Sequence, residues 1–103
     1  MKIMKDIICH MSDTMEEAED YVAEARLIKD EHPQLFSTYL KLAEEHLKHY
    51  MSLHTAVVQI INEYRRQKGE PPKEMTIIWN YEHEKLIEEY EDIKKSIDRA
   101  KMM

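Results

Sequence analysis

Helix-breaking residues are so few in this chain that they fix its layout. One glycine and three prolines occur in 103 residues, and they fall at two places. Pro33 follows KDEH, and proline is tolerated in the first turn of a helix because its missing N–H has no partner there. In QKGEPPKE, residues 67–74, Gly69 suits a helix C-terminus and the two prolines stop the helix from continuing. The sequence predicts one all-α domain, 1–103, with three long antiparallel helices in a bundle over about 3–31, 33–68 and 74–102.

The first helix contains one competing start signal. Thr14 and Glu17 have the spacing of a capping box, which would begin a helix in the middle of the segment. A break there would shift the phase of the apolar positions, and at about 100° per residue the phase is constant through Ser12–Thr14. We therefore expect one continuous helix whose buried stripe is Ile3, Ile7, Met11, Ala18, Val22 and Ala25.

The charge balance excludes some partners. The chain has 15 basic and 21 acidic residues, a net charge of −6 with histidine neutral. Such a chain repels phosphate, so we expect no direct nucleic-acid binding and no membrane partner, but a cation or a basic protein surface suits it. The single Cys9 rules out a disulfide within the chain, and neither a signal-peptide pattern nor an apolar run of about 18 residues is present. These features predict a soluble cytoplasmic protein.

Three histidines are concentrated in LAEEHLKHYMSLH, residues 42–54. On a helical wheel with Leu42 at zero, His46 falls at about 40° and His54 at about 120°, both inside an apolar arc of about 140°. His49 and Glu45 lie at its rim. A single inward histidine is commonly a core residue with a hydrogen bond, and His54 fits that interpretation. His46 and His49 stand one turn apart beside a carboxylate, which suits iron or zinc.

Carboxylates on the other two helices could complete such a site. Antiparallel neighbours around the first turn pair at numbers that sum to about 65, which sets Glu19 opposite His46, with Glu16 and Glu17 further out. On the third helix, Glu89 is the nearest donor. We therefore predict a metal site formed by Glu19, Glu45, His46, His49 and Glu89. The other interpretation is that the acidic residues form ordinary solvated faces.

EDYVAEA, which contains Glu19 and Tyr21, is followed after a short turn by F…LAEEHLKH. This pattern resembles the first hairpin of ferritin-like and rubrerythrin-like proteins over about residues 13–54. Those bundles bind two metals through Glu from some helices and Glu-x-x-His from others. Here the second motif is His46-x-x-His49, and Glu45 is one residue out of register. The resemblance implies iron or zinc as the metal, a fourth helix supplied by dimerisation, and ferroxidase activity only if a di-iron site forms in the dimer.

Two functional classes follow from these features. The first is a ferritin-like metal-binding homodimer, because the apolar arc of the second helix is wide and Trp79, Ile77 and Ile87 lie on different faces of the third. The second is a small acidic, non-enzymatic interaction protein. In size and charge the chain resembles phage-borne inhibitors, anti-CRISPR proteins included, which occupy basic nucleic-acid-binding surfaces of their targets. No catalytic triad, Gly-rich loop or Cys cluster supports another class of enzyme.

Overall fold

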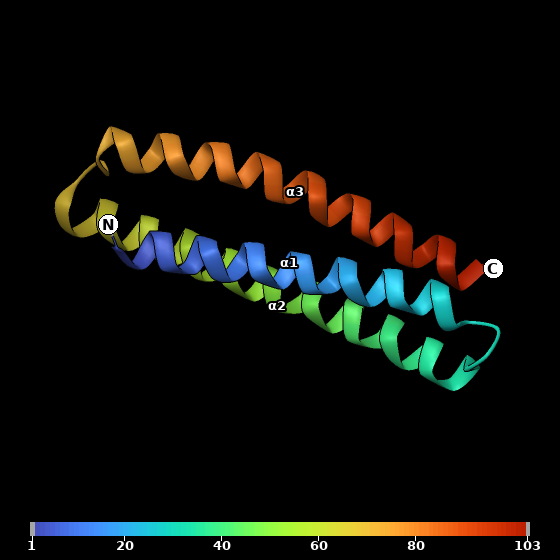
Figure 1. Cartoon of the computed structure of the whole chain (residues 1–103). Coiled ribbons are helices and arrows are strands. Elements are labelled where there is room, and N and C mark those ends of the chain that lie inside the picture. Colours follow the sequence, from blue (N-terminus) through green and yellow to red (C-terminus); the bar gives the residue numbers. More distant parts are fainter. Residues whose placement is uncertain (1, 103) are drawn as a thin grey trace.

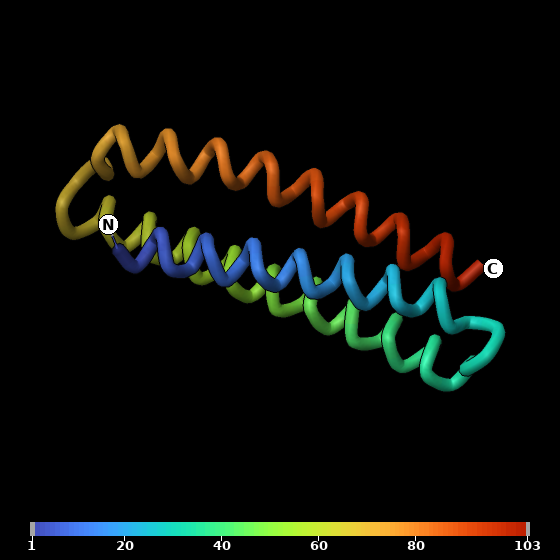
Figure 2. Tube along the Cα trace, viewed as in Figure 1, coloured from blue at the N-terminus to red at the C-terminus, as the bar shows by residue number. Residues whose placement is uncertain are grey.

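The fold is a bundle of three long helices, described for residues 2–102 by the computed structural model. The helices are α1 (Lys2–Ile28), α2 (Pro33–Lys68) and α3 (Lys73–Met102), and no strand occurs in that range. Helices α1 and α3 run in the same direction and α2 runs antiparallel to both (Figure 1), and the trace in Figure 2 shows the two short turns at opposite ends. The molecule measures 56 × 19 × 18 Å, and a 36-residue helix such as α2 spans about 54 Å. The predicted all-α three-helix fold is confirmed.

Both turns form where the prolines and the glycine predicted them. Helix α1 ends at Ile28, three residues before the predicted end. His32 has φ −137°, because the ring of Pro33 disfavours a helical conformation in the preceding residue. The second turn begins at Gly69, whose φ of +89° only glycine adopts without strain. Its N–H donates to the carbonyl of Arg65 at 3.2 Å, which ends α2.

Helix α1 buries a strict seven-residue repeat. Its buried side chains are spaced alternately four and three residues apart: Met4, Ile8, Met11, Met15, Ala18, Val22 and Ala25. The expectation of one helix without a break at Thr14 is confirmed. The expected burial of Ile3 and Ile7 is wrong in its register, because Met4 and Ile8 are buried while Ile3 is exposed and Ile7 half-buried. At about 100° per residue, Met4 lies only about 20° from Met11 around the helix, whereas Ile3 lies about 80° from it and so falls at the edge of the buried stripe.

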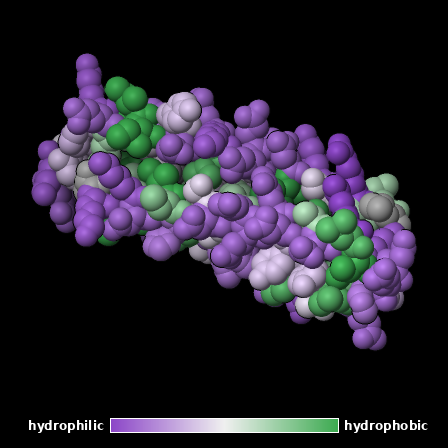
Figure 3. All heavy atoms as spheres, in the orientation of Figure 1, coloured by the Kyte–Doolittle hydropathy of each residue, from purple (hydrophilic) through white to green (hydrophobic). Residues whose placement is uncertain are grey.

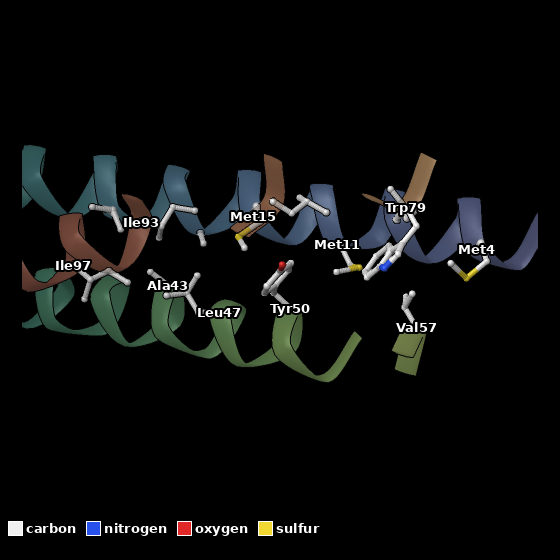
Figure 4. Packing of buried hydrophobic residues seen from close by; sticks show 14 of the residues in the cluster. Met4, Met11, Met15, Ala43, Leu47, Tyr50, Val57, Trp79, Ile93 and Ile97 are labelled. Atoms are coloured by element: carbon white, nitrogen blue, oxygen red, sulfur yellow. The ribbon is translucent and has the colours of Figure 1, made fainter. Parts of the chain in front are cut away.

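The core is filled by long side chains from all three helices. In Figure 4, Met11 and Met15 of α1 lie across from Tyr50 of α2, and Ile93 and Trp79 enter from α3. Near the first turn, Ala25, Leu40 and Ala100 form a second buried cluster, with Phe36 and Tyr39 packed against it. The core therefore has contributions from every helix, and the side chains just outside it occupy the seams between helix pairs.

Some apolar side chains remain on the surface. Figure 3 shows hydrophobic atoms gathered where α3 begins and again near the turn between α1 and α2. Near the start of α3, Ile77 is 65% exposed and Tyr81 is 68% exposed, whereas Trp79 between them is buried. In residues 2–102 no helix combines the length and the apolar character needed to span a membrane.

Candidate functional site

His46 lies at the seam between α1 and α2, and polar contacts at both ring nitrogens orient its ring. Its Nδ1 lies 3.0 Å from the carbonyl oxygen of Leu42. A carbonyl only accepts, so Nδ1 carries a hydrogen. Its Nε2 lies 2.6 Å from Oε2 of Glu17. Tyr21 of α1 packs edge-on against the ring, with centroids 5.2 Å apart. The backbone carbonyl therefore sets the tautomer, and Nε2 is aimed at a carboxylate.

The carboxylate that contacts His46 is Glu17, not Glu19. Glu17, which was expected to lie further out than Glu19, reaches the His46 ring although its side chain is 62% exposed. The long glutamate side chain reaches the neighbouring helix from the rim of α1. His49 stands one turn along α2, and its ring centroid is 5.4 Å from that of His46. The structure thus groups Glu17, His46 and His49, which we call the α1–α2 histidine cluster.

Glu19 and Glu89 lie on a different seam. Glu19 lines a groove between α1 and α3, whose α3 wall includes Asp92 and Ile93. Desolvation of the carboxyl raises the pKa of Glu19, and the charge of Glu89 is the next largest cause. The two predicted carboxylates are therefore near each other, but the seam they share is not that of His46.

Glu45 is half-buried on α2, beside His46 in the sequence. The structure does not gather the five predicted ligands at one point. In residues 2–102, no three His, Cys, Asp or Glu side chains are placed so that they could already hold a metal ion. Of the predicted ligands, His46 and His49 lie together, and Glu19 and Glu89 lie together at another seam. Glu17, which was not predicted as a ligand, lies beside the histidines.

A second histidine pair joins α2 to α3. Nε2 of His54 lies 2.7 Å from Nε2 of His83. The indole of Trp79 packs against both imidazoles, with centroids 5.8 Å from His54 and 4.9 Å from His83. Burial lowers the pKa of His54, and the proximity of His83 lowers it further. The sequence pointed to His54 as a core histidine, but the wheel of one helix could not show that its partner is His83.

One polar group in the core stays unsatisfied. The hydroxyl of Tyr50 is buried and has no hydrogen-bond partner among the described residues. Its ring lies 5.4 Å from that of Tyr90. Burial raises the pKa of Tyr50 to about 12, with smaller effects from Tyr90 and Glu89. This hydroxyl stays protonated at neutral pH.

Comparison of the chain with models of known families, with curated proteins and with solved structures gave no match.

Proposed function

We propose that this protein binds a transition metal ion, zinc or iron, at the α1–α2 histidine cluster. The observation that carries the proposal is the orientation of His46. The Leu42 carbonyl takes the hydrogen of Nδ1, and Nε2 then faces the Glu17 carboxylate at 2.6 Å. A backbone acceptor on the far nitrogen is the usual support of a metal-binding imidazole, because it fixes the ring and makes the other nitrogen a better ligand.

The contact between Nε2 and a carboxylate oxygen needs a positive charge or a proton. With the hydrogen on Nδ1, a neutral ring presents a lone pair at Nε2, and two acceptors repel each other. Either a second proton makes His46 cationic, or a metal ion accepts the lone pairs of both groups. Two imidazoles and one carboxylate are a ligand set that suits zinc and iron.

The exposure of two of the three side chains lets the cluster close around an ion. Glu17 and His49 are exposed, whereas the side chain of His46 is 16% exposed and packed by Tyr21. A nitrogen–oxygen separation of 2.6 Å leaves no room for an ion between ligands about 2.0–2.2 Å from it. Rotation of the Glu17 and His49 side chains opens that space while His46 remains fixed.

Zinc titration by calorimetry tests this proposal. The experiment uses a Cys9→Ser background, because Cys9 is exposed and a cysteine thiolate can itself bind zinc. His46→Ala is expected to remove one equivalent of bound zinc per chain, and Glu17→Gln to weaken that site by about tenfold or more. Glu16→Gln, an exposed neighbour on α1, is the matched control and should change nothing. Equal behaviour of Glu17→Gln and Glu16→Gln would refute the assignment.

The ferritin-like resemblance extends the proposal to a homodimer. A second copy would supply the fourth helix that a single chain lacks, and the Glu19–Glu89 carboxylates would then be its additional acidic ligands. Iron oxidation requires that complete dimeric site, so the metal-binding role alone does not make the protein an enzyme. Sedimentation velocity tests this extension. A single species with the mass of the monomer, at high concentration and with metal present, would rule it out.

The second candidate function is that of a non-enzymatic interaction protein. The exposed Ile77 and Tyr81 favour it, because they stand four residues apart and share one outward face of α3. Acidic residues of the same helix, Glu84 and Glu88, extend this face. An apolar pair with acidic neighbours suits a basic protein surface, including the nucleic-acid-binding surface that an anti-CRISPR inhibitor would occupy.

Inhibition of DNA cleavage by purified CRISPR effectors tests the second candidate. If it holds, the wild-type chain inhibits an effector with or without chelator, and Ile77→Asp with Tyr81→Asp abolishes inhibition. Lys85→Ala, an exposed position on the same helix, is the control that should retain it. Absence of inhibition, or inhibition that the double variant retains, contradicts this role for the α3 face.

A further inference from the structure

Two helices each direct one histidine to the same point. Nε2 of His54 on α2 and Nε2 of His83 on α3 are 2.7 Å apart. The rings are 4.8 Å apart between centroids and inclined by 32°. Trp79 is buried and packs against both rings, which restricts their rotation. The nitrogen atoms that usually ligate metals therefore converge from different helices on one position.

The contact between the two rings favours neutral imidazole over charged imidazolium. A hydrogen bond between two Nε2 atoms requires that one donates and the other accepts, so at least one ring is neutral. A neutral imidazole is the form that binds metal.

We propose that His54 and His83 form a two-histidine clamp that binds zinc, or another divalent ion that prefers imidazole, and ties α3 to α2. This clamp is separate from the α1–α2 histidine cluster, since it uses other residues and another pair of helices. In tetrahedral zinc with Zn–N bonds of about 2.0–2.1 Å, two ligand nitrogens lie about 3.3 Å apart. The two Nε2 atoms therefore need to separate by about 0.6 Å, and the rings need to tilt so that both lone pairs meet at the ion.

The proton balance of the clamp is simple. In the empty neutral pair, one Nε2 carries a hydrogen and donates it to the other. When zinc binds, that ring changes tautomer and carries its hydrogen on Nδ1, so both Nε2 lone pairs face the ion. No net proton is released from a neutral pair, and water completes the coordination. The ion replaces one hydrogen bond with two metal–ligand bonds across the α2–α3 seam.

The α2–α3 seam has another polar bridge, nearer the opposite end of the bundle. There Lys101 of α3 forms a salt bridge with Glu44 of α2. Both side chains are at least 40% exposed, so solvent screens this pair. The half-buried histidine clamp is therefore the better candidate for a contact between α2 and α3 that a bound ion strengthens.

Thermal unfolding in zinc and in chelator tests the clamp without reference to the first site. The background carries Cys9→Ser, His46→Ala and His49→Ala, so the α1–α2 histidine cluster cannot contribute. In this background the unfolding midpoint should rise with each tenfold increase in zinc, because an ion that binds only the folded chain stabilises it by mass action. His83→Gln should abolish the rise, and His10→Ala, at an exposed histidine, should leave it intact.

A zinc-independent midpoint in that background would overturn the clamp and leave the α1–α2 proposal standing. A rise that survives His83→Gln would overturn it as well. Circular dichroism verifies that each variant is folded before zinc is added. Nitrogen-15 spectra of the unsubstituted chain give a measurement that needs no substitution at the pair. Zinc should give both His54 and His83 the pattern of a ring protonated at Nδ1, and an unchanged pair would contradict the clamp.

Discussion

Replacement of Tyr50 by phenylalanine should stabilise this protein. The Tyr50 hydroxyl is buried in the core with no hydrogen-bond partner among the described residues, while its ring packs between the three helices. Burying a hydroxyl without a partner costs about 1–3 kcal/mol. Phenylalanine retains the ring and removes the unsatisfied atom, but it leaves a small void. We expect Tyr50→Phe to raise the free energy of unfolding by about 1 kcal/mol, which for a domain of this size raises the melting temperature by about 4–8 °C.

The stability difference between Tyr50→Phe and the wild type should depend on pH because of the same hydroxyl. Burial raises the pKa of Tyr50 from 10.0 to about 12 in the folded chain. Because the folded state holds this proton more tightly than the unfolded state, the contribution to stability is complete below pH 10 and is lost as the pH rises through 12. By pH 12 the loss amounts to about 2 kcal/mol. Tyr50→Phe has no such group, so its advantage over the wild type should grow between these pH values.

Urea unfolding followed by circular dichroism measures both effects. Tyr81→Phe is the matched control, because Tyr81 is 68% exposed and its hydroxyl is solvated. It should change the stability by less than about 0.5 kcal/mol. If Tyr50→Phe destabilises the protein by 1 kcal/mol or more, the hydroxyl has a partner, and the reasoning from an unsatisfied group is wrong. An advantage that stays constant from neutral to alkaline pH would refute the electrostatic part.

Two further substitutions test the turn and the core. Gly69→Ala should lower the free energy of unfolding by about 1–2 kcal/mol, because a φ of +89° strains any residue with a Cβ, although no atom lies within 4 Å of the added methyl group. Urea unfolding measures this loss, with Glu70→Ala as the control. An unchanged stability would mean that the turn has another conformation. Met15→Ala should lower the free energy of unfolding by about 2–5 kcal/mol, because Met15 is fully buried. Met51→Ala should lower it by less than about 1 kcal/mol, because Met51 is 45% exposed. Similar losses for the two variants would contradict the assigned core.

Local signals were sufficient to predict the helices. Pro33 and Gly69 act on the backbone through sterics that are independent of the rest of the chain, so α2 begins and ends where the sequence placed it. Helix α1 ends at Ile28, three residues before the predicted end, and the steric effect of Pro33 covers only His32, so the proline alone does not locate that end. Met4 rather than Ile3 is buried because Met4 lies about 20° from Met11 around the helix, whereas Ile3 lies about 80° from it, at the edge of the stripe.

The contacts in the candidate site depend on how the helices lie relative to one another, so the sequence predicted them less accurately than the helices. Residue arithmetic locates Cα atoms at matching heights, but a glutamate side chain extends over roughly a helical turn, so Glu17 rather than Glu19 contacts His46. The contact between His54 and His83 has the same origin, since it needs the relative shift of α2 and α3. The proximity of Glu89 to Glu19 is what the predicted ligand set implies, but the two carboxylates meet at the seam between α1 and α3 rather than at His46.

The location of bound zinc is the most direct test of the central claim, that the α1–α2 histidine cluster is a metal site. Crystals of the zinc-loaded protein, measured at the zinc absorption edge, give an anomalous difference map that locates the ion. We predict a peak about 2.0–2.1 Å from Nε2 of His46, with Glu17 and His49 as its other protein ligands. A zinc-loaded crystal in which His46 keeps its present contact with Glu17, with no anomalous peak beside Nε2, would contradict the claim.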